Sequence, residues 1–174
     1  MSTQALAAGG VCGYNKAMEK REKTNVMRFL DAKKIAHECY FFDCETAPSG
    51  EEVAAILHKD PAQVFKTLVT AGKSGAHYVF MVPVTGELDL KKAAAAAGEK
   101  NVEMIKSKDL LPLTGYVHGG CSPIGMKKYF PTFIHSSAKD LPTVIFSAGK
   151  IGRQVELAPA DLFKAVRISY ADLT

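Results

Sequence analysis

The pattern of apolar and polar positions becomes regular at Thr24 and predicts a series of helices and strands from there onward. Residues 26–35 carry apolar side chains at helical spacing, and Thr24 can cap that helix. A strand is expected over residues 36–42. Ser49 and Glu52 then form a capping box, which marks the start of a second helix.

The middle of the chain reads as a helical turn followed by a β-hairpin. Asp60 and Pro61 predict a short helical turn that leads into an apolar strand around Lys66. The turn at residues 73–75 connects this strand to a second one at residues 78–84, which is the pattern of a hairpin.

The rest of the chain predicts further helices and short strands. Asp89 can cap a helix that runs through the alanines at 93–97 and ends at Gly98. The remaining elements are expected at 102–105, 132–136, 143–147 and 155–157 as strands, with a final amphipathic helix opened by Pro159. Since strands outnumber helices and hairpins join them, we expect an α+β domain with one mixed, strongly curved β-sheet flanked by helices.

Length and composition fit a single globular domain. The chain has 174 residues, of which 47% are hydrophobic and 23% are charged, and it contains no apolar run long enough for a membrane helix. In residues 1–22 the apolar positions follow neither helical nor strand spacing, and the segment lacks the features of a signal peptide. We expect them to be a flexible extension, so that the domain occupies residues 23–174.

Cysteine usage and charge narrow the classes of function. The cysteines at 12, 39, 44 and 121 lack the paired spacings of zinc sites, which favours reduced thiols and a cytoplasmic location. His37, Cys39 and Cys44 lie close in sequence, but on a strand only the first two share a face, so we expect neither a metal nor another cofactor. A net charge of +4 permits RNA binding without demanding it.

Residues 118–125, His-Gly-Gly-Cys-Ser-Pro-Ile-Gly, are the most informative segment. Three glycines and a proline in eight residues exclude a helix or a central strand, so this is a shaped loop. Gly119 and Gly120 can let the backbone approach a ligand and direct N–H groups at a carbonyl oxygen. An ordinary turn has the same composition, however, and context must decide between the two interpretations.

Two other residues supply that context. Lys66 lies within an apolar, β-branched strand pattern, where a lysine needs either a partner for its ammonium group or a position at a sheet edge. Ser147 opens a glycine-containing turn between two apolar runs, where turn chemistry alone can explain a serine.

In their order along the chain, these segments resemble the YbaK/EbsC family of aminoacyl-tRNA deacylases, which is related to the editing domain of bacterial prolyl-tRNA synthetases. The similar stretches are 23–25, 40–43, 65–68, 86–92, 100–104, 114–116, 119–125 and 147–157. The resemblance implies the same α+β fold and a deacylase that releases a mischarged amino acid, most of all cysteine, from tRNA(Pro). It also makes prolyl-tRNA synthetase a candidate partner.

The resemblance further implies roles for individual residues. Activity should depend most on Lys66, while Gly119 and Gly120 would supply backbone donors near the ester. The implied substrate-binding residues are Tyr40, Cys121, Ser122, Pro123, Ser147 and Gln154. Some cysteine-specific relatives have an acidic residue after the turn where this chain has Gln154. An amide cannot offer a carboxylate to the amino group of the substrate, so the preferred amino acid stays open.

Two functions of other classes also stay open from the sequence. Cys121 could be the nucleophile of a thiol hydrolase, with His118 or His135 as its base, provided that the pKa of the thiol is lowered. Alternatively, the chain could be a non-catalytic module that binds RNA or a synthetase.

Overall fold

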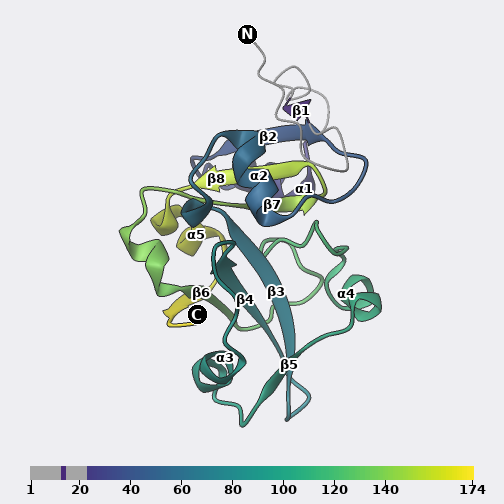
Figure 1. Cartoon of the computed structure of the whole chain (residues 1–174), viewed down its shortest axis with the longest axis vertical. Coiled ribbons are helices and arrows are strands. Elements are labelled where there is room, and N and C mark those ends of the chain that lie inside the picture. The colour runs from purple at the N-terminus through teal and green to yellow at the C-terminus, as the bar shows by residue number, and fades with distance from the viewer. Residues whose placement is uncertain (1–12, 15–22) are drawn as a thin grey trace.

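The computed structural model of the protein describes residues 13–14 and 23–174, and two β-sheets form its framework (Figure 1). The first sheet is antiparallel throughout and has the strand order β1-β2-β8-β7. Its strands are β1 (Gly13–Tyr14), β2 (Glu38–Asp43), β8 (Arg153–Leu157) and β7 (Val144–Lys150).

The second sheet is mixed and has the order β5-β3-β4-β6-β9. Its strands are β5 (Val102–Met104), β3 (Phe65–Gly72), β4 (His77–Pro83), β6 (Thr132–His135) and β9 (Ile168–Ala171). β3 and β4 form the predicted hairpin, whereas β4, β6 and β9 run parallel. The two sheets meet where Val64, directly before β3, bridges Ile145 in β7.

Helices begin where the capping signals predict them. The helices foreseen from the sequence are α1 (Asn25–Ala32), α2 (Gly50–Leu57), the short 3-10 helix η2 (Pro61–Gln63), α3 (Leu90–Ala97) and α5 (Pro159–Ala165). The side chains of Thr24, Ser49, Asp60 and Asp89 each accept a hydrogen bond from a first-turn N–H group, which satisfies donors that the helix leaves unpaired.

Besides β1, the elements that the sequence did not predict are α4 (Ser107–Thr114), the 3-10 helix η3 (Ser136–Asp140) and β9. α4 has no side-chain cap and contains Pro112. A proline inside a helix removes a backbone donor, so the local sequence argues against the helix that tertiary packing produces.

The main hydrophobic core lies between the two sheets. Phe41 and Phe146 from the first sheet meet Phe65 and Met81 from the second, and α1 adds Leu30. The opposite face of the first sheet packs against α2, and the opposite face of the second sheet packs against α3. Each sheet therefore packs against other elements on both faces. This packing fixes the position of β3 relative to the first sheet.

The α+β class is confirmed, with three differences from the expected details. The strands divide between two sheets instead of forming one. Gly13 and Tyr14, which we expected to lie outside the fold, pair with Asp43 and Phe42 of β2, while the rest of the expected N-terminal extension lies outside the described residues. Cys44 is disulfide-bonded, so the expectation of reduced cysteines is wrong at this position.

Candidate functional site

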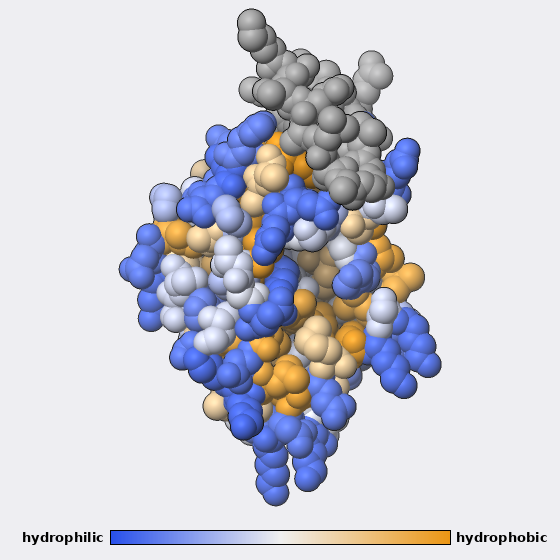
Figure 2. All heavy atoms as spheres, viewed as in Figure 1, coloured by the Kyte–Doolittle hydropathy of each residue, from blue (hydrophilic) through white to orange (hydrophobic). Residues whose placement is uncertain are grey.

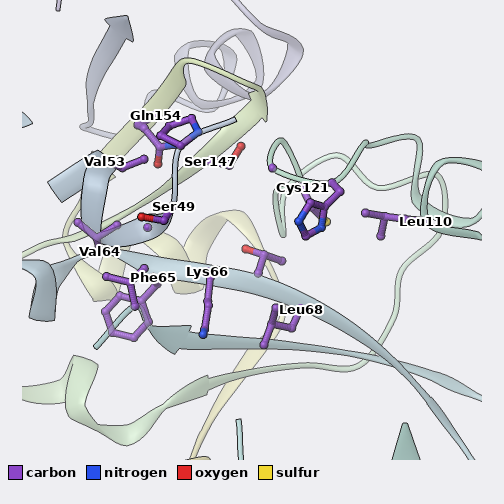
Figure 3. A pocket seen from close by; sticks show the side chains of 16 residues that line it. Ser49, Val53, Val64, Phe65, Lys66, Leu68, Leu110, Cys121, Ser147 and Gln154 are labelled. Atoms are coloured by element: carbon purple, nitrogen blue, oxygen red, sulfur yellow. The ribbon is translucent and has the colours of Figure 1, made fainter. Parts of the chain in front are cut away.

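A pocket of about 260 Å³ opens beside the N-terminal part of β3, between α2, the β7–β8 hairpin and the loop at 118–121 (Figure 3). We call it the site pocket. It brings together these residues predicted for the site: Lys66, Gly119, Cys121, Ser147 and Gln154. Its other walls are mainly apolar, with side chains from several elements: Val53, Val64, Phe65, Leu68, Val84 and Leu110. Small-molecule sites have this character, with apolar walls and a few polar groups.

Strand pairing explains why Ser147 and Gln154 lie together. The two residues are direct partners in the β7–β8 ladder, and Tyr40 of β2 is the partner of Gln154 on its other side. Residues that pair directly across strands point to the same face of a sheet. These three side chains therefore form a row under α2, and the row ends at the site pocket.

Gln154 is the most exceptional polar group of the pocket. Its residue is only 7% exposed, and within the described part of the chain its side-chain amide has no hydrogen-bond partner. Gln154 lines the site pocket, and its amide is not among the fully buried polar atoms that lack a partner, so it is available to a ligand. Ser147 Oγ accepts a hydrogen bond from the N–H of Gly149 at 3.2 Å, and its own proton is free to be donated.

The glycine loop follows the expected geometry only in part. Gly119 has φ +85°, and a Cβ there would lie 2.8 Å from Cβ of Ala47, so a side chain is disfavoured on both grounds. The N–H of Gly120 donates to the carbonyl of Val117 at 3.0 Å and is engaged in a turn. In the described residues the N–H groups of Gly119 and Cys121 have no acceptor, so these two are the available donors.

The ammonium group of Lys66 lies 3.1 Å from Oε1 of Glu87, and the two side chains are 28% and 90% exposed. Figure 3 shows the Lys66 side chain extending from β3 away from Ser147 and Cys121. An ion pair this exposed contributes about 1 kcal/mol at most. An anionic ligand can therefore replace Glu87 as the partner of Lys66 with little loss of free energy.

Tyr40 does not line the pocket. Its hydroxyl proton is shared between the carboxylates of Glu156 and Glu38, and burial raises the pKa of Tyr40, so the phenol stays neutral. Burial acts to raise the pKa of Glu156 as well, but hydrogen bonds from Thr143, Tyr40 and Lys59 outweigh it and leave that pKa below its usual range. These hydrogen bonds fix the side chain of Tyr40 next to Gln154, its partner in the β2–β8 ladder.

Ser122 and Pro123 also lie outside the pocket. Ser122 is fully buried, and its Oγ accepts a hydrogen bond from the N–H of Ile124 at 3.3 Å. Pro123 lines a separate pocket next to Phe29. Their contacts shape the loop that presents Gly119 and Cys121.

The pocket does not activate Cys121 as a nucleophile. Its side chain is largely enclosed, and burial raises the pKa of the thiol to about 12. The thiolate is the reactive form, so a thiol with this pKa is almost entirely unreactive near neutral pH. His118 lines the pocket, whereas Nδ1 of His135 accepts a hydrogen bond from the N–H of Leu173 near the C-terminus.

Sequence reasoning missed several residues of the pocket. Thr67 lines it, as do Ser49 and Gly50 at the start of α2 and Leu110 from α4. The capping signal at Ser49 located the helix without indicating what its first turn faces. Leu110 belongs to the helix that the sequence did not predict.

Within the residues that the structure describes, no three His, Cys, Asp or Glu side chains form a group able to hold a metal ion. Nδ1 of His37 lies 2.7 Å from the carbonyl oxygen of Ile35, and Cys39 is not part of a disulfide. The described helices are all too short or too polar to cross a bilayer.

Residues 44–165 match the family model of the aminoacyl-tRNA editing domain. This chain belongs to that family. A relative from Enterococcus faecalis, provisionally named Cys-tRNA(Pro)/Cys-tRNA(Cys) deacylase EbsC, is 44% identical over 155 residues, which cover 88% of this chain and 94% of the relative. A proline–tRNA ligase from Thermosipho africanus is 27% identical over 67% of this chain and 20% of the ligase.

Solved structures show the same fold for this editing domain. One, provisionally described as a trans-editing enzyme for prolyl tRNA synthetase, superimposes with a TM-score of 0.76 at 22% identity, over 88% of this chain and 99% of that one. A hypothetical protein superimposes with a TM-score of 0.78 at 20% identity, over 86% of this chain and 99% of that one. Both confirm the fold that places the pocket.

Proposed function

We propose that this protein is a freestanding deacylase that releases mischarged cysteine from tRNA(Pro). The observation that carries the proposal is the site pocket, in which Lys66, Ser147 and the unpartnered amide of Gln154 meet a glycine loop inside mainly apolar walls. The name of the 44% identical relative supports the same substrate. A cytoplasmic location follows from that substrate.

The walls of the site pocket suit a small, weakly polar side chain. Val53, Val84 and Leu110 offer no hydrogen bonds, so a thiol is accommodated more easily there than a strongly polar group. The carbonyl oxygen of Gln154 and the hydroxyl of Ser147 can bind the amino group of the substrate. Because Gln154 is neutral, it binds an ammonium group less strongly than a carboxylate would.

The chemistry needs no protein nucleophile. The thiol of the substrate cysteine loses its proton and attacks the carbonyl carbon of its own ester. A carbon–sulfur bond forms, the carbon–oxygen bond to the ribose breaks, and the ribose oxygen takes up a proton. The product is a small cyclic thioester that water then opens. The N–H groups of Gly119 and Cys121 are candidates to stabilise the negative charge on the carbonyl oxygen.

The direct test is release of labelled amino acid from tRNA(Pro) charged with cysteine, alanine or proline. We expect rapid release of cysteine and little release of proline. Failure to release any amino acid from a folded protein would instead support a non-catalytic binding module. Because a proline–tRNA ligase contains a related region, the assay should be repeated with prolyl-tRNA synthetase present.

Replacing Cys121 by alanine is expected to preserve most of the cysteine release. The thiol is protonated because its pKa is about 12, and it packs against Val69 and Leu110 as an apolar group. The loss of one buried sulfur should lower stability modestly, by about 1 kcal/mol. Rates under single-turnover conditions and thermal unfolding measure the two effects. Abolished release in a folded Cys121→Ala protein, with an acyl adduct trapped on the wild type, would establish the thiol hydrolase.

Replacing Glu87 by glutamine is expected to leave release unchanged or to raise it by up to roughly fivefold. The variant frees Lys66 from an ion pair worth about 1 kcal/mol at most. Asp172→Asn is the matched control, since it removes the exposed partner of Lys92, and neither of these residues lines the site pocket. A decrease as large as that expected for loss of Lys66 would show that Glu87 itself is needed for the reaction.

A further inference from the structure

A second pocket adjoins the site pocket and has no role in the chemistry described so far. It has a volume of about 220 Å³ and lies between β3, the end of β5 and the first turn of α4. We call it the neighbouring pocket. It shares a wall with the site pocket, formed by Thr67, Leu68, Leu110 and His118. Figure 2 shows apolar side chains exposed in the middle of this face, over β3 and toward α4, with hydrophilic side chains around them.

We propose that the neighbouring pocket binds the 3′-terminal nucleoside of the tRNA, an inference that rests on the proposed function. The ester joins the amino acid directly to the ribose of that nucleoside. If the amino acid occupies the site pocket, the ribose must lie at its rim and the base must lie next to it. The shared wall places the neighbouring pocket at that position.

The chemistry of the neighbouring pocket fits a nucleotide. Val69, Met104 and Ile105 provide an apolar surface, and Met104 is 47% exposed, so a flat base can stack on it. Lys106 stands at the edge of the pocket and forms no ion pair within the described residues. None of the described residues that line the pocket is acidic, so nothing there opposes a phosphate.

The wall between the two pockets carries an additional polar group. Oγ1 of Thr67 is buried and has no hydrogen-bond partner among the described residues. A buried hydroxyl without a partner is unfavourable, and a small side-chain rotation would let it bond a ribose hydroxyl placed between the pockets. The unsatisfied group therefore lies where the ribose is expected.

Adenosine 5′-monophosphate is the probe for a direct test, because it carries the base, ribose and phosphate of the terminal nucleoside. Methionine methyl groups labelled with carbon-13 report binding, and Met104→Leu assigns the Met104 signal. We expect a saturable shift of Met104 and none of Met81, which is fully buried. No shift of Met104 up to roughly 10 mM, where a site worth about 4 kcal/mol is mostly occupied, would overturn the inference.

Two comparisons make the test specific. Inorganic phosphate should not reproduce the shift, and an equal effect of phosphate alone would show an anion site instead of a nucleoside site. Lys106→Ala should weaken nucleotide binding roughly fivefold, as expected for one exposed charge contact. Lys108→Ala is the matched control, because Lys108 is also exposed but lies outside the neighbouring pocket. Equal effects of both variants would contradict the placement.

The same two variants connect binding to turnover. Lys106→Ala should raise KM for cysteinyl-tRNA by a similar factor while kcat changes little, whereas Lys108→Ala should leave both nearly unchanged. The nucleotide titration requires no turnover. The neighbouring pocket can therefore fail this test while the deacylase activity stands, and it can pass if the activity is absent.

Discussion

Replacing Lys66 by alanine is expected to slow release of cysteine from tRNA(Pro) by roughly two orders of magnitude or more, which corresponds to about 3 kcal/mol. The ammonium group of Lys66 is the cation at the margin of the site pocket, and its only ion pair in the described residues is the weak one with Glu87. It can therefore turn to the phosphate or ribose of the acceptor end and hold the ester in the pocket.

Folding should survive this substitution. The side chain of Lys66 is partly exposed, and its ion-pair partner is almost fully exposed, so Tm should change by no more than about 4 °C. Lys73→Ala is the matched control, because it removes an exposed lysine from the far end of the same hairpin. Near-normal single-turnover release by folded Lys66→Ala would remove Lys66 from the mechanism.

Replacing the thiol of the substrate by a hydroxyl should slow release at least as strongly as replacing Lys66 by alanine. A free thiol has a pKa near 8.5, so about a few per cent is thiolate at neutral pH, whereas a hydroxyl forms almost no alkoxide. We therefore expect seryl-tRNA(Pro) to react roughly a hundredfold or more slowly than cysteinyl-tRNA(Pro). The measurement is the single-turnover rate for each, corrected for spontaneous hydrolysis.

The pH dependence gives an independent test of the same mechanism. Release of cysteine should rise between about pH 7 and pH 9 as the substrate thiol ionises, and then level off. Cys121 cannot produce this rise, because its pKa of about 12 keeps it protonated throughout that range. Equal rates for the cysteine and serine substrates would indicate that an activated water attacks the ester, which would make the enzyme a simple hydrolase.

The predictions that depend on residues close together in the sequence were the most accurate. Thr24, Ser49 and Asp89 cap helices in the structure as predicted, because a side-chain oxygen needs only the backbone two or three residues ahead of it. The β3–β4 hairpin follows for the same reason, since a short turn brings two adjacent strands into register.

Features that depend on distant partners could not be predicted in this way. The division into two sheets is set by which strands pair, and β2 finds its partner β8 more than a hundred residues later. α4 forms despite Pro112, because Leu110 packs against Val69 and Cys121. Periodicity reports only that a face is apolar, not what will cover it.

The sequence alone determined the residue types of the site, the family resemblance and the places where helices begin. Tertiary structure decided which of those residues meet. Lys66, Ser147 and Gln154 line one pocket, whereas Tyr40 and Ser122 are held outside it by their own hydrogen bonds. Tertiary structure also decided the reactivity of Cys121. Burial raises the pKa of its thiol, and burial depends on how the whole chain packs.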